Sequence, residues 1–272
     1  MQGSIRGKGD PKVMHGLIVL AHPEKNSLNA QLAGAARERF ACGGNTVEVL
    51  DLYEAGFDPL ECGDHYGCRA NGAFFSALTE QRHASDTGTL PADVAGAIDQ
   101  IDRADLVMFQ FPLWWWSMPA ILKGWIDRVF VWGGVYTSSM RYCDCGRFRG
   151  KRTFLSVTTG APEPAFGPDG RAGNLDMILW PIHFGLSYVG FEVLPPLRSF
   201  GVISDSAQGS PISDGTSGYL DALNRHIDAL ESLEAIRFNT SADWDREGRL
   251  RPDAPSFSPF IRHARPILGD PS

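Results

Sequence analysis

The sequence predicts an α/β fold, a doubly wound parallel sheet of five strands with helices on both faces and a C-terminal extension. Short apolar runs of strand length alternate with segments of helical period, which favours parallel pairing through right-handed crossovers. The 272 residues also suffice for one large domain with its own core. We expect this domain over residues 13–236. A Pro-rich extension over residues 237–272 is expected to pack on the domain or on a partner subunit.

Five short runs rich in β-branched and aromatic residues are expected to be the strands, because turn-forming residues bound each of them. His22-Pro23 follows the first run, and Pro112 follows the third. The five expected strands are Gly16–Ala21, Thr46–Leu52, Asp105–Phe111, Thr153–Thr159 and Phe191–Leu194.

The longer segments between the strands carry helical periodicity and residues typical of helix boundaries. Asn26 or Ser27 can cap the first helix, and Gly43-Gly44 follows its end. The expected helices are Ser27–Phe40, Val94–Ile101, a segment from Ala120 onward, Met177–Tyr188 and Tyr219–Ile236.

Three segments fall outside this alternation. Residues 58–90 are rich in Gly, His, Ser and Thr with little periodicity, which predicts a long irregular excursion. Residues 201–218 form a polar insertion. Residues 251–272 contain five prolines, so we expect no regular secondary structure there.

Composition and charge argue against several kinds of partner. The formal net charge is −7 and no basic stripe offsets it, which argues against a nucleic-acid surface. The first apolar run is too short to span a bilayer, so we expect no membrane insertion. The five cysteines lack the paired spacing of metal ligands. We expect reduced thiols, no bound metal and a cytoplasmic location.

The loop after the first expected strand runs from His22 to Asn29 and leads into a helix. Helix N-termini present free N–H groups and the positive end of the helix dipole. This loop is therefore suited to a pyrophosphate, with Ser27 and Asn29 as side-chain donors. The alternative is an ordinary capped helix start in which His22 is bonded within the turn.

Three consecutive tryptophans, Trp114 to Trp116, follow the third expected strand. Loops at the carboxyl ends of parallel strands hold the ligands of α/β sheets, and aromatic walls suit a planar conjugated molecule. We interpret this loop as one side of a flavin pocket. A buried core cluster or a protein interface is the alternative, because aromatic residues are common in both.

The fourth expected strand ends in a turn of small residues, Thr158 to Ala161. Such a turn lets backbone amides approach a ligand closely, and amides at a flavin's pyrimidine edge would stabilise its reduced anion. An ordinary strand-to-helix turn is the alternative. The chain has neither a G-x-G-x-x-G nor a Walker-type loop, which argues against a Rossmann dinucleotide domain and a P-loop kinase.

These ordered motifs together resemble the flavodoxin-fold NAD(P)H:quinone oxidoreductases, the DT-diaphorase group with its bacterial relatives. The resemblance covers roughly residues 15–200. Its motifs are LIVLAHPE with SLN (Leu17–Asn29), DLYEAGFDP (Asp51–Pro59), FQFPLWWWSMPAILKGWIDRVF (Phe109–Phe130), TTGA (Thr158–Ala161) and ILWPI (Ile178–Ile182).

The resemblance implies a flavodoxin-like fold, a homodimer with active sites at its interface, and non-covalently bound FAD, with FMN less favoured. Residues in three loops would bind the cofactor: His22, Ser27, Leu28 and Asn29; Pro112, Leu113, Trp114, Trp115 and Trp116; Thr158, Thr159, Gly160, Ala161 and Phe166. Family members complete the substrate cavity with aromatic residues from the partner subunit. The matching substrate positions are Trp116, Phe166, Tyr136 and Tyr188.

The sequence departs from the mammalian pattern after TTG. Mammalian members carry a Tyr and a His in that loop, and the corresponding positions are Phe166 and Ala172. Neither side chain donates a hydrogen bond or a proton. We therefore assign no catalytic residue, and expect that backbone amides suffice or that the reaction differs. The insertion at 201–218 also obscures the region where the family contacts adenine.

The implied function is a two-electron reduction of quinones or similar planar electrophiles by NAD(P)H, with ping-pong hydride transfer through FAD. The alternative is a regulatory flavoprotein, similar to the ancillary subunits of potassium efflux systems that share this fold. The missing Tyr/His pair and the Pro-rich tail favour that alternative. A one-electron carrier is a weaker hypothesis, because such carriers are usually shorter. The physiological acceptor and the choice between NADH and NADPH stay open.

Overall fold

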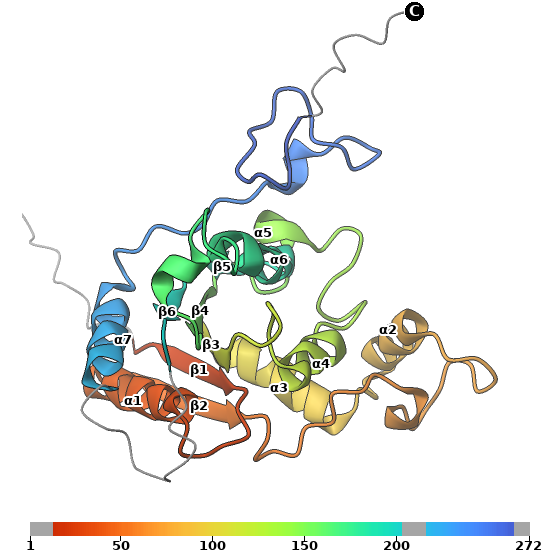
Figure 1. Cartoon of the computed structure of the whole chain (residues 1–272). Coiled ribbons are helices and arrows are strands. Elements are labelled where there is room, and N and C mark those ends of the chain that lie inside the picture. Colours follow the sequence, from red (N-terminus) through yellow and green to blue (C-terminus); the bar gives the residue numbers. More distant parts are fainter. Residues whose placement is uncertain (1–12, 203–215, 264–272) are drawn as a thin grey trace, which may run out of the picture.

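The computed structural model describes residues 13–202 and 216–263, and these residues form an α/β sandwich around one parallel sheet (Figure 1). The strands run in the order β2-β1-β3-β4, with β5 and β6 both paired to the outer edge of β4. Their bounds are β1 His15–Leu20, β2 Thr46–Asp51, β3 Leu106–Pro112, β4 Arg152–Thr158, β5 Glu192–Val193 and β6 Leu197–Ser199.

Strands β1 to β5 match the five strands expected from the sequence, whereas β6 was not expected. The edge strand is divided because Pro195-Pro196 cannot donate to the ladder, so β5 and β6 are two short strands in one position. The strand order reverses between β1 and β3, the point at which open α/β sheets hold their ligands. The predicted doubly wound parallel sheet is therefore confirmed.

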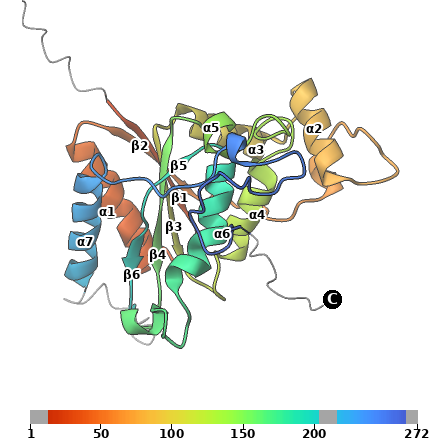
Figure 2. The same ribbon diagram turned by 90° about the horizontal axis from the view of Figure 1, so that it is seen from above.

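Helices cover both faces of the sheet (Figure 2). Helices α1 (Leu28–Cys42) and α7 (Ser217–Ala229) lie on one face, and α3 (Ala92–Arg103), α4 (Ala120–Val129) and α6 (Leu175–Tyr188) lie on the other. Two cores result, because alternate side chains of each strand point to opposite faces. None of the helices in the described ranges is both long and apolar enough to cross a bilayer.

The segment 58–90, expected to be irregular, contains the helix α2 (Ala77–Thr87). This helix has little apolar periodicity to predict it. Its buried Glu80 instead pairs with Arg69 over 3.0 Å and accepts the amide of Ala70 over 2.7 Å. Helical periodicity in a sequence arises when a helix buries an apolar stripe. A helix that is held in place by a buried carboxylate therefore cannot be predicted from this pattern.

Two further boundaries differ from the prediction. Helix α7 ends at Ala229 rather than Ile236, and β3 continues through Pro112, which pairs with Thr158. A short helix, α5 (Tyr142–Cys145), was not expected. Most of the predicted insertion, residues 203–215, lies outside the described residues.

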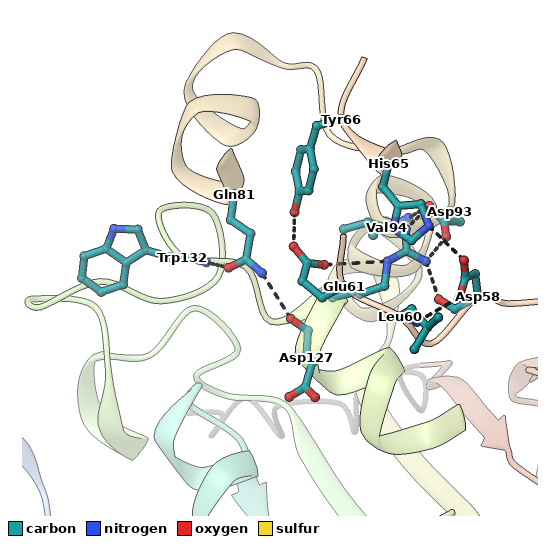
Figure 3. A network of polar contacts seen from close by, with 11 residues as sticks. Asp58, Leu60, Glu61, His65, Tyr66, Gln81, Asp93, Val94, Asp127 and Trp132 are labelled. Carbon is teal, nitrogen blue, oxygen red and sulfur yellow. Dashed lines mark hydrogen bonds and ion pairs between the residues drawn. The ribbon is translucent and has the colours of Figure 1, made fainter. Parts of the chain in front are cut away.

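Arg128, near the end of α4, holds the segment 58–90 to the body of the domain. Its buried guanidinium donates to the backbone carbonyl of Asp58 over 2.7 Å and to the carboxylate of Asp93 over 2.6 Å. It also lies 4.8 Å from the ring centroid of Phe57. In Figure 3, Asp58 and Asp93 approach each other from separate segments of the chain.

A second link in the same network holds α2 to the loop that follows α4. Gln81 donates to the backbone carbonyl of Asp127 over 3.2 Å and accepts the amide of Trp132 over 3.0 Å (Figure 3). Nearby, Tyr66 donates to Glu61 over 2.6 Å. The excursion is therefore fastened to the helix that begins just after the tryptophan loop.

The described part of the C-terminal extension, residues 237–263, packs on α5 and α6. The ring of Phe260 stacks on Trp180 of α6 at 4.6 Å between centroids. The amide of Ser241 donates to the Asp144 carboxylate of α5 over 3.0 Å.

Candidate active site

Three loops leave the sheet at the carboxyl ends of neighbouring strands. Residues 21–27 follow β1, residues 113–119 follow β3, and residues 159–174 follow β4. Because β1, β3 and β4 are adjacent, their loops share one edge of the sheet. The structure thus brings together the three segments in which the sequence placed the cofactor-binding residues.

The first loop presents the N-terminus of α1. The hydroxyl oxygen of Ser27 accepts the amide of Ala30 over 3.1 Å and so caps the helix. The amides of Leu28 and Asn29, the two residues before Ala30, donate to no described residue. They remain available at the positive end of the helix dipole, where an anion is stabilised.

His22 lies between this first loop and the tryptophan loop. Its Nδ1 accepts the amide of Glu24 over 3.0 Å, and its ring centroid lies 6.0 Å from that of Trp114. Burial lowers the pKa of His22, so the ring is neutral near pH 7. With Nδ1 accepting, the neutral ring carries its proton on Nε2, which then serves as a donor.

Asn29 does not offer its side chain to the loops, contrary to the sequence-based expectation. Its amide is buried beneath the edge, where Nδ2 donates to Oγ1 of Thr158 over 3.0 Å and Oδ1 accepts from Gln110 over 2.8 Å. Only the backbone amide of Asn29 has no acceptor among the described residues. Gln110 was missed by the sequence analysis. The available signal was a polar residue in the otherwise apolar strand LVMFQFP.

The tryptophan loop is a tight reverse turn. The backbone groups of Trp114 and Ser117 exchange two hydrogen bonds of 3.0 Å each. Trp115 and Trp116 between them have φ of 49° and 57°, the pattern of a type I′ turn. Trp115 is 91% exposed, so the core-cluster alternative does not describe it. Left-handed backbone in two bulky residues is strain of the kind that clusters at ligand sites.

The third loop leaves backbone donors free as well. Thr159 donates its amide to Ser199 over 2.8 Å, and Ala161 accepts the amide of Gly201 over 3.0 Å. The amides of Gly160 and Ala161 have no acceptor among the described residues. A Cβ added at Gly160 would meet only the Val202 carbonyl, at 3.8 Å, so the turn is open on that side.

Phe166 and Ala172 lie farther along this loop. Phe166 ends a short 3₁₀ segment, and its ring centroid lies 5.9 Å from that of Phe200. The backbone carbonyl of Ala172 accepts a hydrogen bond from the indole nitrogen of Trp116 over 2.7 Å. The second and third loops are therefore in direct contact, and neither Phe166 nor Ala172 brings a side-chain donor.

Tyr136 and Tyr188 lie at the other end of the sheet. Tyr188 is the last residue of α6, about 20 Å along the helix from its start beside the third loop. Tyr136 follows α4, which also runs away from the candidate site, and the two ring centroids are 5.9 Å apart. Within this chain these tyrosines do not join the three loops.

A cavity of about 580 Å³ also lies away from these loops, between β5 and the C-terminal extension. Among its lining residues are Phe191, Phe238 and Phe257, and none of the sequence-predicted cofactor residues contributes to it. In the described part of the chain, no three His, Cys, Asp or Glu side chains gather as metal ligands would. The candidate site is instead an open surface between loops.

Comparisons with known proteins agree with this arrangement. The family described as having a flavodoxin-like fold matches residues 14–219. The chain is 41% identical over 235 residues to NAD(P)H dehydrogenase (quinone) 1 of Rattus norvegicus, covering 86% of this chain and 83% of that protein. It is also 41% identical over 188 residues to ribosyldihydronicotinamide dehydrogenase (quinone) of Mus musculus, covering 68% and 81%.

A solved structure from Klebsiella pneumoniae, described as a "putative quinone reductase", superposes with a TM-score of 0.80 at 38% identity. The match covers 88% of this chain and 94% of that one. Strand order, loop positions and sequence identity therefore all indicate the same family. The chain belongs to the flavodoxin-like family of NAD(P)H:quinone oxidoreductases.

Proposed function

We propose that the protein reduces quinones or similar planar electrophiles with NAD(P)H, using a flavin held by the three loops. The observation that carries this proposal is the convergence of free backbone amides with exposed indole rings at one edge of the sheet. Such a surface suits a molecule with an anionic end and a flat end. Two of the relatives carry the names of quinone-dependent dehydrogenases, which supports the same activity here.

The described residues fit a flavin with a phosphate tail. The amides of Leu28 and Asn29 and the Nε2 of His22 suit the pyrophosphate, since all three are donors. The tryptophan turn suits the flat ring system, with Gly160 leaving room at its other edge. We favour FAD over FMN on the family resemblance. Mass spectrometry of the released cofactor distinguishes the two.

The bound flavin would supply two-electron transfer between a reduced nicotinamide and a quinone. The chain's own part is to bind and orient. The indole rings of the tryptophan turn stack flat guests, and the amides of Gly160 and Ala161 stabilise negative charge at that edge. Because Phe166 and Ala172 offer no acidic proton, protons exchange with solvent. NAD(P)H and the quinone bind in turn at one open surface between the tryptophan turn and residues 159–174, which we call the slot. This order of binding is a ping-pong sequence.

We also propose a homodimer in which the partner completes each slot. Exposed apolar side chains on the excursion support an interface, since Leu60, Phe74 and Leu78 are 69%, 70% and 54% exposed. Tyr136 and Tyr188 lie too far from their own loops and suit the partner's slot instead. Sedimentation equilibrium tests the dimer, and a monomer at all concentrations would refute it.

A cytoplasmic location is proposed from the thiols. All five cysteines are free, and Cys42, Cys68 and Cys145 are exposed. Exposed free thiols are typical of a reducing compartment. Cell fractionation of the source organism tests this proposal.

The activity is tested by anaerobic stopped-flow of the flavin-loaded protein against NADH and NADPH, with a quinone in a second mixing step. We expect rapid bleaching of the oxidised flavin band, followed by reoxidation when quinone arrives. A flavin that binds but stays oxidised with both nucleotides would overturn the proposal. That outcome would favour the regulatory flavoprotein instead.

A further inference from the structure

The tryptophan turn is hydrogen-bonded to the loop after β4 through the side chain of Trp116. The indole Nε1 of Trp116 donates to the carbonyl of Ala172 over 2.7 Å, joining positions 56 residues apart. Trp115 has the same left-handed backbone, yet its indole bonds to no described residue and is almost fully exposed. The two tryptophans therefore differ in whether the indole N–H has an acceptor, and this difference can be tested.

The loop that accepts the hydrogen bond of Trp116, residues 162–173, also has hydrogen bonds within itself. The amide of Ala172 donates to the carbonyl of Ala165 over 2.9 Å, and the amide of Gly173 donates to Gly170 over 3.0 Å. A Cβ at Gly170 would fall 2.3 Å from the Ala165 carbonyl, so the loop folds closely on itself. Holding Ala172 therefore holds the whole segment, including the neighbouring Phe166.

The turn is also a rigid support. Reciprocal hydrogen bonds between Trp114 and Ser117 close it, and it begins directly at the end of β3. Its left-handed residues keep a costly conformation, which persists only where the surroundings enforce it. A bond from such a support restrains a loop more than a bond from a mobile side chain does.

We propose that Trp116 is a positioning residue, whose indole N–H clamps residues 162–173 to the tryptophan turn and sets the width of the slot between them. The proposal rests on the proposed function of that slot. NAD(P)H or a quinone binds productively only while the loop is clamped. The apparent affinity for either substrate is therefore proportional to the fraction of molecules in which the loop is clamped. Both half-reactions therefore depend on the same bond.

The test compares Trp116→Phe with the unmodified protein. A typical net hydrogen bond is worth about a fivefold change in the ratio of clamped to unclamped loop. We expect kcat/KM for NAD(P)H and for the quinone to fall by the same factor, at most about fivefold, through KM, with kcat little changed. Trp180→Phe, on the outer face of α6, is the activity control.

Hydrogen exchange supplies a readout that needs no turnover. The amides of Ala172 and Gly173 should exchange about fivefold faster in Trp116→Phe, and at the original rate in Trp115→Phe. In the unmodified protein, the indole N–H of Trp116 should exchange more slowly than that of Trp115. This last comparison holds even if the variant fails to fold.

Three results would overturn the clamp: equal indole exchange for the two tryptophans, unchanged loop exchange in Trp116→Phe, or unequal losses in the two half-reactions. A failure of the proposed function looks different. In that case the unmodified flavin protein is not reduced by NAD(P)H, while the exchange data still decide whether the clamp exists.

Discussion

Gly124 of α4 lies directly against the backbone of Pro59, at the start of the excursion. A Cβ placed on Gly124 would stand 2.2 Å from the Pro59 carbonyl oxygen and 2.4 Å from its Cβ. The obstacle is backbone, which cannot rotate away as a side chain can. The glycine therefore permits the contact by which α4, the helix after the tryptophan turn, receives the segment 58–90.

Gly124→Ala is expected to destabilise the protein by at least about 1–3 kcal/mol, because overpacking must displace α4 or Pro59. The matched control is Gly96→Ala in α3, where an added Cβ meets nothing within 4 Å. That change should be neutral or should stabilise by up to about 1 kcal/mol. Urea unfolding of both variants measures the difference. Equal effects at the two glycines would contradict the close approach.

Arg128→Met removes the buried cation that bonds Asp58 and Asp93. We expect a loss of about 3 kcal/mol in unfolding free energy, because the partners are left without their donor. Asp93 is partly exposed, so water can hydrate its carboxylate once the arginine is removed. We therefore expect a loss of unfolding free energy near the lower limit for a broken buried ion pair. Arg103→Met, which breaks a surface pair with Glu48, should cost less than about 1 kcal/mol. Chemical unfolding compares the two variants, and a smaller loss for Arg128→Met would refute the anchoring role.

Gln110→Leu tests the buried link beneath the loops. The substitution removes the shorter of the two hydrogen bonds that Oδ1 of Asn29 accepts and leaves only the 3.3 Å bond from Oγ1 of Thr158, at a cost of about 1–3 kcal/mol. It should also weaken flavin retention, because α1 loses its link to β3. Thr153→Val is the control, since it removes a buried hydrogen bond to Val107 at the other end of the strands. Flavin titration by fluorescence should show weaker binding only in Gln110→Leu. Equal binding in both variants would show that the link serves stability alone.

Phe166→Tyr restores a hydroxyl in the third loop. We expect the rate of flavin reduction to rise, by up to about 10²-fold, or to stay unchanged, since an added donor can stabilise developing charge. Phe238→Tyr, in the C-terminal extension, adds the same hydroxyl remote from the loops. Stopped-flow reduction by NAD(P)H compares the two. A large decrease in Phe166→Tyr would mean that this ring does not border the slot.

His183 makes stability depend on pH. Burial, with Arg198 as a smaller cause, lowers the pKa of His183 from 6.5 to about 4. The unfolded chain takes up the proton first, so the contribution of this group is complete above pH 6.5 and is lost as pH falls toward 4. Between pH 7 and pH 4 the loss is about 3 kcal/mol. His183→Gln should remove this pH-dependent contribution. As the pH falls from 7 to 4, the unfolding free energies of the two proteins should therefore approach each other by about 3 kcal/mol. Parallel pH profiles would contradict it.

Much of the fold followed from local patterns. The apolar runs and their turn residues located β1 to β5 within one residue at each end but missed β6, and the order of motifs indicated the three loops that we propose share a ligand. These features are short-range, because a strand's periodicity and a helix cap each depend on a few neighbouring residues. Helix α2 was missed because a buried carboxylate holds it rather than an apolar stripe.

The sequence by itself determined the class of fold, the edge of the sheet that we propose carries the site and the chemical character of the loops at that edge. Only the tertiary structure decided that Asn29 turns inward to Gln110 and that Trp116 reaches Ala172. These partners lie 81 and 56 residues apart, so no local pattern records them. Their meeting depends on strand register and on a left-handed turn, and both of these are settled only when the sheet and its loops pack together.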